Sequence, residues 1–176
     1  ASLYVDLVSR YELDGVGLDY IRYPDVYSLN YDERNRRAIL DRFGIDIIAE
    51  DPTKNPDHWA KIQVYRAELI DQAIKKIKQR VQEIKPNIPV IASLISERSM
   101  SAKGVGQDWT RSSRHLDYSS PMNYDDVSLY TDLLEFQRDV FSKNNSVFIP
   151  AIGGMPRVQN SWTLSEWAHR IAVQRK

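Results

Sequence analysis

The chain contains no cysteine, and this excludes disulfide bonds and thiolate metal sites. Its three histidines, His58, His115 and His169, are scattered along the chain without the spacing of metal ligands. We therefore predict no metal site, and no cofactor is indicated. No run approaches the roughly 18 apolar residues of a membrane span. The first twelve residues lack the basic and apolar regions of a signal peptide, so no such peptide is visible here.

An excess of charge of either sign is also missing, because 24 basic side chains balance 24 acidic ones. Without a long-range electrostatic field, we predict neither a nucleic-acid partner nor binding to an anionic membrane. Glycine is scarce, at 7 residues, and no glycine-rich phosphate loop follows any apolar run. This disfavours a nucleotide-binding open sheet. The absence of a Gly-x-Ser-x-Gly sequence argues against an esterase.

Four short apolar runs predict buried strands, and the segments between them predict helices. The strands fall at 16–21, 89–95, 116–124 and 147–152, and the helices at 32–43, 58–84, 127–142 and after Thr163. The helix at 58–84 has the clearest pattern, with apolar residues at three- and four-residue steps and Lys, Arg, Gln and Glu on its other face. Trp109 is expected to pack in the core.

Strands that alternate with long helical crossovers indicate right-handed βαβ units and a parallel sheet. A complete (β/α)8 barrel takes about 250 residues, whereas this chain has 176 and room for four such units. The sequence therefore predicts an α/β fold, a partial (β/α)8 TIM barrel, in one incomplete domain over residues 1–176. The connection at 25–57 is long enough to shape the rim of a site.

The most informative segment is DGVGLDYIRYP at residues 14–24. Asp-Gly is typical of a turn, and the alternation that follows places Val16 and Leu18 on one side and Gly17 and Asp19 on the other. Asp19 comes at the carboxyl end of the strand, where parallel α/β folds carry their chemistry. Asp14 lies about 16 Å away along the strand at roughly 3.3 Å per residue. Paired glycosidase carboxyl groups lie about 5 to 9.5 Å apart, so these two aspartates are not a catalytic pair.

The chain resembles the glycosyl hydrolase-like 10 family in this segment, in QDWTRSSRHLDYSSPMNYDD at 107–126 and in FIPAIGG at 148–154. The resemblance implies a bacterial (β/α)8 barrel of glycoside hydrolase type. It aligns the chain with the fourth to seventh β/α units, so the first three strands and the eighth would be absent. It also implies an extracellular or periplasmic location.

A comparison with family 18 chitinases shows that this chain lacks the acid residue of their catalytic pattern. Their DxxDxDxE pattern falls on Asp14, Gly17, Asp19 and Ile21, so an isoleucine occupies the position of the acid. Their Met-x-Tyr-Asp sequence has a counterpart at 122–125. The architecture is therefore expected to be similar, whereas the family 18 mechanism does not transfer directly.

Asp19 is the central catalytic candidate, because a carboxylate on the inward face of a barrel strand is costly unless it is paired or functional. It would act as acid or nucleophile. Glycoside hydrolysis needs a second carboxylate. Glu97, after the second predicted strand, and Asp125, after the third, compete for this position. Asp126 is a further alternative, although its place before a predicted helix is typical of a cap.

Five further residues at strand ends are candidates for substrate binding: Tyr20, Arg22, Asn123, Tyr124 and Gly153. Tyrosine rings near strand ends suit stacking on sugar faces, and amide and hydroxyl groups can orient a sugar. Arg22 would pair with Asp19, bind a carboxylate or hydroxyl of the substrate, or form a surface ion pair. A glycine after a strand lets the chain turn or a ligand approach.

These observations predict a glycoside hydrolase that acts on a polysaccharide or oligosaccharide by carboxylate acid/base chemistry. Two alternatives remain. The first is a carbohydrate-binding barrel without turnover, which Ile21 and the missing strands favour. The second is an α/β interaction domain that self-associates through open strand edges.

Overall fold

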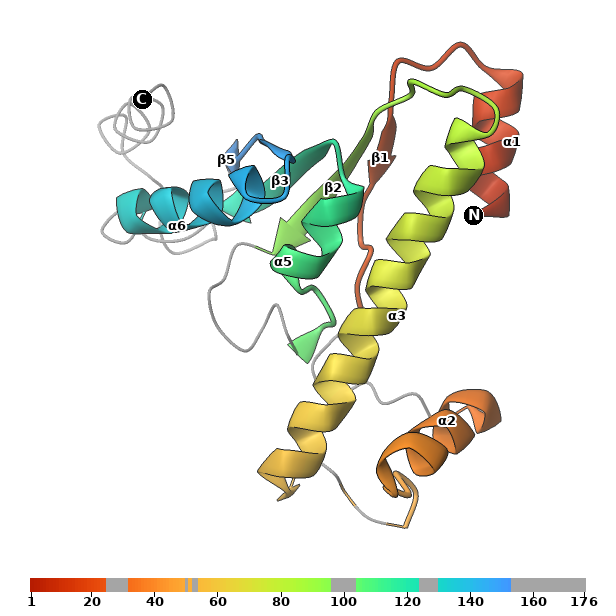
Figure 1. The fold of residues 1–176 in the computed structure, drawn as a ribbon, viewed down its shortest axis with the longest axis vertical. Coiled ribbons are helices and arrows are strands. Elements are labelled where there is room, and N and C mark those ends of the chain that lie inside the picture. The colour runs from red at the N-terminus through yellow and green to blue at the C-terminus, as the bar shows by residue number, and fades with distance from the viewer. Residues whose placement is uncertain (25–31, 50, 52–53, 96–103, 124–129, 153–176) are drawn as a thin grey trace, which may run out of the picture.

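A computed structural model describes residues 1–24, 32–49, 51, 54–95, 104–123 and 130–152. The helices are α1 (Ser2–Arg10), α2 (Glu33–Phe43), α3 (Pro56–Gln82), α5 (Trp109–Ser112), the 3-10 turn η2 (Ser113–His115) and α6 (Tyr130–Ser142). The strands are β1 (Val16–Leu18), β2 (Val90–Ile95), β3 (Tyr118–Asn123), β4 (Val147–Phe148) and β5 (Ala151–Ile152). Figure 1 shows this order along the chain. The predicted helix after Thr163 lies outside the described residues.

All pairings in the sheet are parallel, and the strands follow one another in chain order as β1-β2-β3-β4, with β5 also paired to β3. The predicted α/β fold with the architecture of a partial (β/α)8 barrel is thereby confirmed. The strand predicted at 147–152 is divided into β4 and β5. Pro150 stands between them and has no N–H to donate to the ladder.

The first strand is shorter than predicted and ends at Leu18 instead of residue 21. Tyr20 has a φ of 52°, in the left-handed region, and a strand cannot continue through that conformation. As a result Ile21 packs against the main hydrophobic core. The position that aligns with the family 18 acid therefore turns away from the row on which Asp19 lies.

The main core lies between one face of the sheet and the helices. Val16 and Leu18 of β1 and Val90, Ala92 and Leu94 of β2 are buried, because alternate residues of each strand point to the same side. They join buried residues of α3, α5 and α6: Ile74, Ile77, Val81, Trp109, Leu133 and Phe141. The prediction that Trp109 packs in the core is confirmed, with 7% of the residue exposed.

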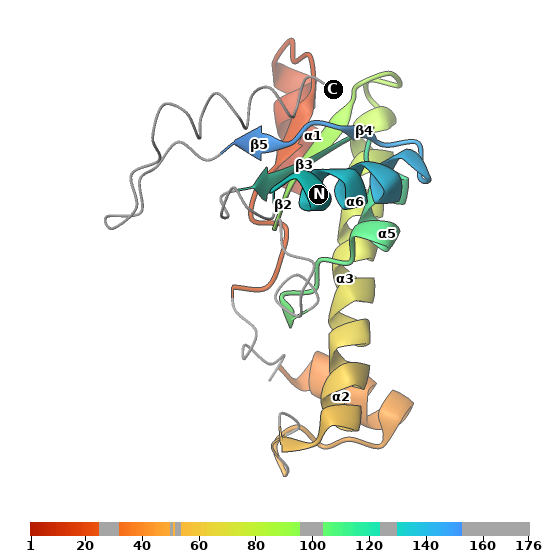
Figure 2. The same cartoon turned by 90° about the vertical axis from the view of Figure 1, so that its left-hand side faces the viewer.

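A second hydrophobic cluster lies beyond the strands. The helix α3 has 27 residues and is about 40 Å long, whereas a six-residue strand spans about 20 Å. Its N-terminal half therefore extends past the sheet, where α2 packs beside it (Figure 1; Figure 2). The cluster consists of Ile39, Ile45, Ile47, Ile62 and Tyr65. We call α2, the following loop to residue 49 and the N-terminal half of α3 the α2–α3 arm.

The helices of this arm begin and end where local sequence signals place them. The side chain of Asp32 accepts a hydrogen bond from the Asn35 N–H at 3.1 Å and caps α2. Gly44 closes α2 with a φ of 71°, which favours glycine. The helix α3 starts two residues before the predicted 58, because Asn55 caps it and Pro56 fits the first turn. Within the described ranges, no helix combines the length and hydrophobicity that a bilayer crossing requires.

Candidate functional site

Asp19 follows β1 directly and is exposed. Its Oδ1 atom accepts a hydrogen bond from the Tyr20 N–H at 2.9 Å. Since Leu18 pairs with Ala92, the register continued by one residue sets Asp19 beside Ser93, and Ser93 itself pairs with Ser120. Neighbouring strands are about 4.8 Å apart. A carboxylate and two hydroxyl groups thus form a row across three strands, on the face that points away from the helices.

The two serines of this row were not predicted as site residues. Ser93 and Ser120 are partly exposed, whereas their neighbours Ala92, Leu94 and Ser119 are buried against the helices. The sequence did hold a signal for these two serines, because each is a polar residue inside a predicted apolar strand. Their alignment with Asp19 depends on strand register, which a single sequence does not specify. Gly17, one step earlier on the same face as Asp19, leaves space in front of the sheet.

Tyr20 and Arg22 form a stacked pair next to Asp19. The guanidinium carbon of Arg22 lies 4.6 Å from the centre of the Tyr20 ring. Arg22 Nη1 also donates to the carbonyl oxygens of Tyr23 and Pro24, each at 3.2 Å. The described contacts of Arg22 are therefore with the turn that follows β1, and the Asp19 carboxylate takes its hydrogen bond from the backbone instead.

A buried glutamine, Gln107, joins the carboxyl ends of β1 and β2. Its Nε2 atom donates to the carbonyls of Ile21 at 3.3 Å and Ser93 at 3.4 Å, and its Oε1 atom accepts from the Ile95 N–H at 2.8 Å. Only 1% of the residue is exposed. Gln107 thus positions the strand ends on which Asp19 and Ser93 lie, a role that the sequence did not predict.

The residues just before Gln107 hold the turn after β1 against α3. The Tyr23 N–H donates to the Val105 carbonyl at 2.8 Å. Gly106 has a φ of 77°, and a Cβ atom there would lie 3.1 Å from the Tyr23 ring and 3.2 Å from the Arg66 carbonyl. A side chain at position 106 would therefore be strained by conformation and by crowding. We call residues 104–108 the strap.

Arg66 differs from the prediction for the helix at 58–84, whose basic residues were expected on the solvent-exposed face. It is fully buried, and its guanidinium carbon lies 4.1 Å from the centre of the Tyr23 ring and 5.8 Å from that of Trp59. Arginine is tolerated in such a place when its planar cation lies over aromatic rings. This contact fixes the chain after β1 to α3, beside the candidate site.

Asn123 lies on the side of the sheet away from Asp19. Its buried amide pairs reciprocally with that of Gln137 on α6, with both hydrogen bonds at 2.8 Å. The alternation of β3 gives the other side of the strand to Met122. This placement differs from the expectation that Asn123 faces a substrate, because its amide holds the end of β3 on α6.

Four of the predicted site residues, Glu97, Tyr124, Asp125 and Gly153, lie outside the described residues, as does the alternative Asp126. Among the predicted carboxylates of the site, Asp19 is therefore the one with a described environment. Its partner in catalysis stays a prediction.

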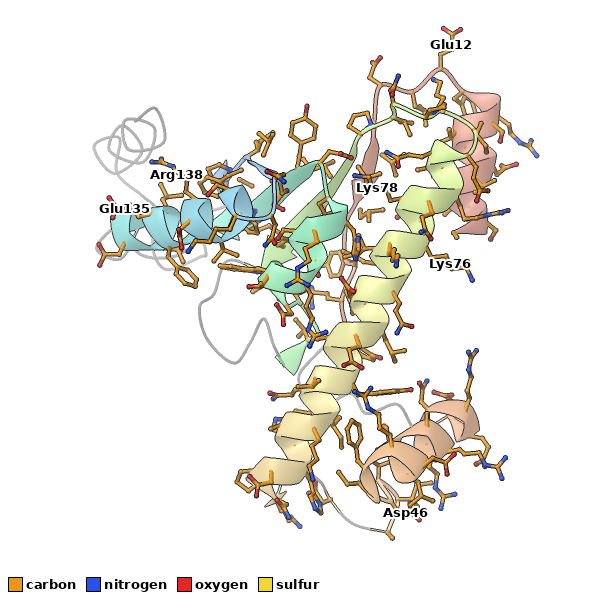
Figure 3. All side chains as sticks on the ribbon, in the orientation of Figure 1. Glu12, Asp46, Lys76, Lys78, Glu135 and Arg138 are labelled. Carbon is orange, nitrogen blue, oxygen red and sulfur yellow. The ribbon has the colours of Figure 1, made fainter. Side chains whose placement is uncertain are left out.

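Asp117 illustrates a carboxylate with a structural function at the opposite end of the sheet. Its two oxygens accept from Lys78 Nζ and from the Val90 N–H, each at 2.8 Å. In Figure 3, Lys78 lies on the side of α3 that faces the strands, whereas Lys76 points away. Asp117 thus joins the amino ends of β2 and β3 to α3 and belongs to the framework.

A groove of 1040 Å³ lies between α1 and α3, lined by Val5 and Asp6 on one helix and Ala73 and Ile77 on the other. These helices cover the face of the sheet that is opposite to the row containing Asp19. This groove is therefore separate from the candidate site, which lies at the carboxyl ends of β1, β2 and β3.

A parallel sheet in chain order with crossover helices is the architecture of a (β/α)8 barrel segment. The family model of the glycosyl hydrolase-like 10 proteins matches residues 1–149, and the chain belongs to this family. The match includes β1 to β4, the strap and the row of Asp19, Ser93 and Ser120. A search of curated proteins finds no match.

Proposed function

We propose that this chain carries part of the active site of a glycoside hydrolase that cleaves a polysaccharide, with Asp19 as a catalytic carboxylate. The supporting observation is that Asp19 is exposed and directly follows β1, whose register, continued by one residue, sets its position beside Ser93 and through it Ser120. Membership of a glycosyl hydrolase-like family supports the same chemistry.

In this proposal Asp19 acts as acid or nucleophile, and a second carboxylate completes the reaction. Glu97 follows the end of β2 by two residues and Asp125 follows the end of β3 by two residues, so both remain candidates. Ser93 and Ser120 would donate hydrogen bonds to sugar hydroxyls. Tyr124 and Gly153 stay predicted contacts, whereas Asn123 would act by positioning the end of β3.

The proposal is tested by Asp19→Asn in the whole protein, with release of reducing ends from a panel of polysaccharides as the measurement. Loss of an acid, base or nucleophile lowers turnover by about 10² to 10⁴-fold. Asp14→Asn is the matched control, because Asp14 is also exposed but lies before the amino end of β1. We expect the control to keep full activity. An Asp19→Asn protein that releases reducing ends at the original rate would exclude Asp19 from the mechanism.

A second candidate function is carbohydrate binding without turnover. Ile21 favours it, since the residue at the family 18 acid position packs against the hydrophobic core. This function predicts that the unmutated protein binds oligosaccharides while releasing no reducing ends from any member of the panel.

A further inference from the structure

Tyr20 combines two features that rarely occur together. It has a φ of 52°, and 72% of the residue is exposed. Among the described residues, the other non-glycine residue with positive φ is Asn145, a type that tolerates this conformation. A bulky residue held there is strained, and such strain clusters at functional sites. An exposed tyrosine in a strained backbone conformation adds little to stability, so a function at this position better explains its presence.

The Tyr20 ring is held in place although it is exposed. The Arg22 guanidinium lies over it at 4.6 Å, and Nη1 of the same group is bound to the Tyr23 and Pro24 carbonyls. The Tyr23 N–H is in turn bound to the strap at Val105. An aromatic surface that is already ordered loses less entropy when it binds a ligand. Arg22 covers one face of the ring, and most of Tyr20 stays exposed among the described residues.

We propose that Tyr20 is a stacking platform for a neutral pyranose ring of the glycan chain. Tyr20 follows Asp19 directly, so their Cα atoms are about 3.8 Å apart. The Tyr20 N–H also donates to Asp19 Oδ1 at 2.9 Å. A sugar stacked on Tyr20 would thus bind beside the residue proposed as the catalytic carboxylate, and in this respect the inference rests on the proposed function. The C–H face of a pyranose is apolar and matches the face of an aromatic ring.

The position of Arg22 favours a neutral sugar over an acidic one. Its guanidinium lies over the Tyr20 ring and its Nη1 atom donates to two backbone carbonyls, so an acidic sugar would have to compete with these contacts. The exposed Asp19 carboxylate next to the platform would repel the carboxylate of a uronic acid. Arg22 is therefore a positioning residue for Tyr20 and not a binding group for an anionic substrate.

The test compares binding of neutral tetrasaccharides, made of β-1,4-linked glucose, mannose or xylose, with that of a galacturonate tetrasaccharide by calorimetry. We expect the whole protein to bind at least one neutral chain, and Tyr20→Asn to weaken this binding by about tenfold. Because asparagine tolerates positive φ, the Tm of Tyr20→Asn should stay within about 2 °C of the original or rise. Tyr20→Trp keeps an aromatic face and should keep binding.

Tyr11→Asn is the matched control, because Tyr11 is 59% exposed but has an ordinary φ of −125°. It should leave binding unchanged. The inference is overturned if no neutral chain binds, if Tyr20→Asn binds as well as the original, or if its Tm falls by more than about 2 °C. Tighter, salt-sensitive binding of galacturonate that is lost in Arg22→Gln also overturns it. Loss of reducing-end release in Asp19→Asn, measured on the polysaccharide panel and not on these tetrasaccharides, would leave the proposed function standing in each case.

Discussion

At the scale of single residues, buried polar groups shape the site. Gln107, Asn123 and Gln137 are each at most 1% exposed, and their amides are paired with backbone groups or with each other. A buried amide without partners would cost several kcal/mol, whereas a paired one is tolerated and accepts one geometry. These residues therefore set where β1, β2 and β3 end, and hence where Asp19 and the two serines lie.

Gln107→Leu is expected to destabilise the protein by about 1–3 kcal/mol, because the Ile95 N–H and two carbonyls lose a buried partner. Denaturation in urea measures this change as a shift of the midpoint at constant slope. Gln79→Leu, at an exposed position of α3, is the control and should change stability by less than about 0.5 kcal/mol. Equal midpoints for the two variants would contradict the role assigned to Gln107.

At the scale of elements, ion pairs and caps hold the α2–α3 arm together. Arg36 binds Asp46 with two hydrogen bonds, at 3.1 and 2.9 Å, and joins α2 to the loop that follows it. Arg42 pairs with Glu68 and joins α2 to α3. The bond to Arg36 lowers the pKa of Asp46 to about 2, and the bond to Arg42 lowers the pKa of Glu68.

The arm should therefore lose stability in acid. The folded pKa of Asp46, about 2, lies below its ordinary value of 3.8. Its contribution is complete above the ordinary value and is lost as the pH falls toward the folded one. We expect the Tm difference between the original protein and Asp46→Asn to be constant from about pH 6 to pH 5 and to shrink below about pH 4.

Asp41→Asn serves as the control for this series, because it removes an exposed carboxylate from α2, the helix that carries Arg36, and leaves the pair of Arg36 and Asp46 intact. Its Tm difference from the original protein should not follow the pattern of Asp46→Asn. A difference for Asp46→Asn that stays constant down to about pH 2.5 would show that the ion pair does not stabilise the folded arm.

At the scale of the whole molecule, α3 joins two separate hydrophobic clusters. Its C-terminal half packs under the sheet, and its N-terminal half packs with α2 beyond the strands. The other face of the sheet, with Ile91, Tyr118 and Met122, is only partly exposed but has no share in the main cluster. Parallel sheets normally bury both faces, and in a barrel this second face is the interior.

Two core truncations test this division. Leu94→Ala removes a fully buried side chain under the sheet and should cost about 2–5 kcal/mol in global stability. Ile62→Ala removes the same number of carbons from the cluster of the arm, at 1% exposure. Hydrogen exchange should show faster opening of α2 amides in Ile62→Ala with little change in β2. Equal loss of protection in α2 and β2 would show that the two clusters unfold as one.

Local patterns in the chain were sufficient to predict much of this architecture. Helical periodicity predicted α2, α3 and α6 to within a few residues, and alternating strands and helices predicted the parallel sheet. The placement of Asp19 at a strand end also came from a short segment. These signals act between residues close in sequence, so neighbouring side chains and backbone preferences are enough to specify them.

Long-range contacts decided the rest. Gln107 and Ile21 are 86 positions apart, and no local pattern indicates that they meet or that the polar Gln107 and Arg66 are buried. The orientation of Asn123 followed from its pairing with Gln137, since polar residues on both sides of β3 left the alternation undecided. The row of Asp19, Ser93 and Ser120 exists because three strands adopt one register, and register is a property of packed strands and not of each strand alone.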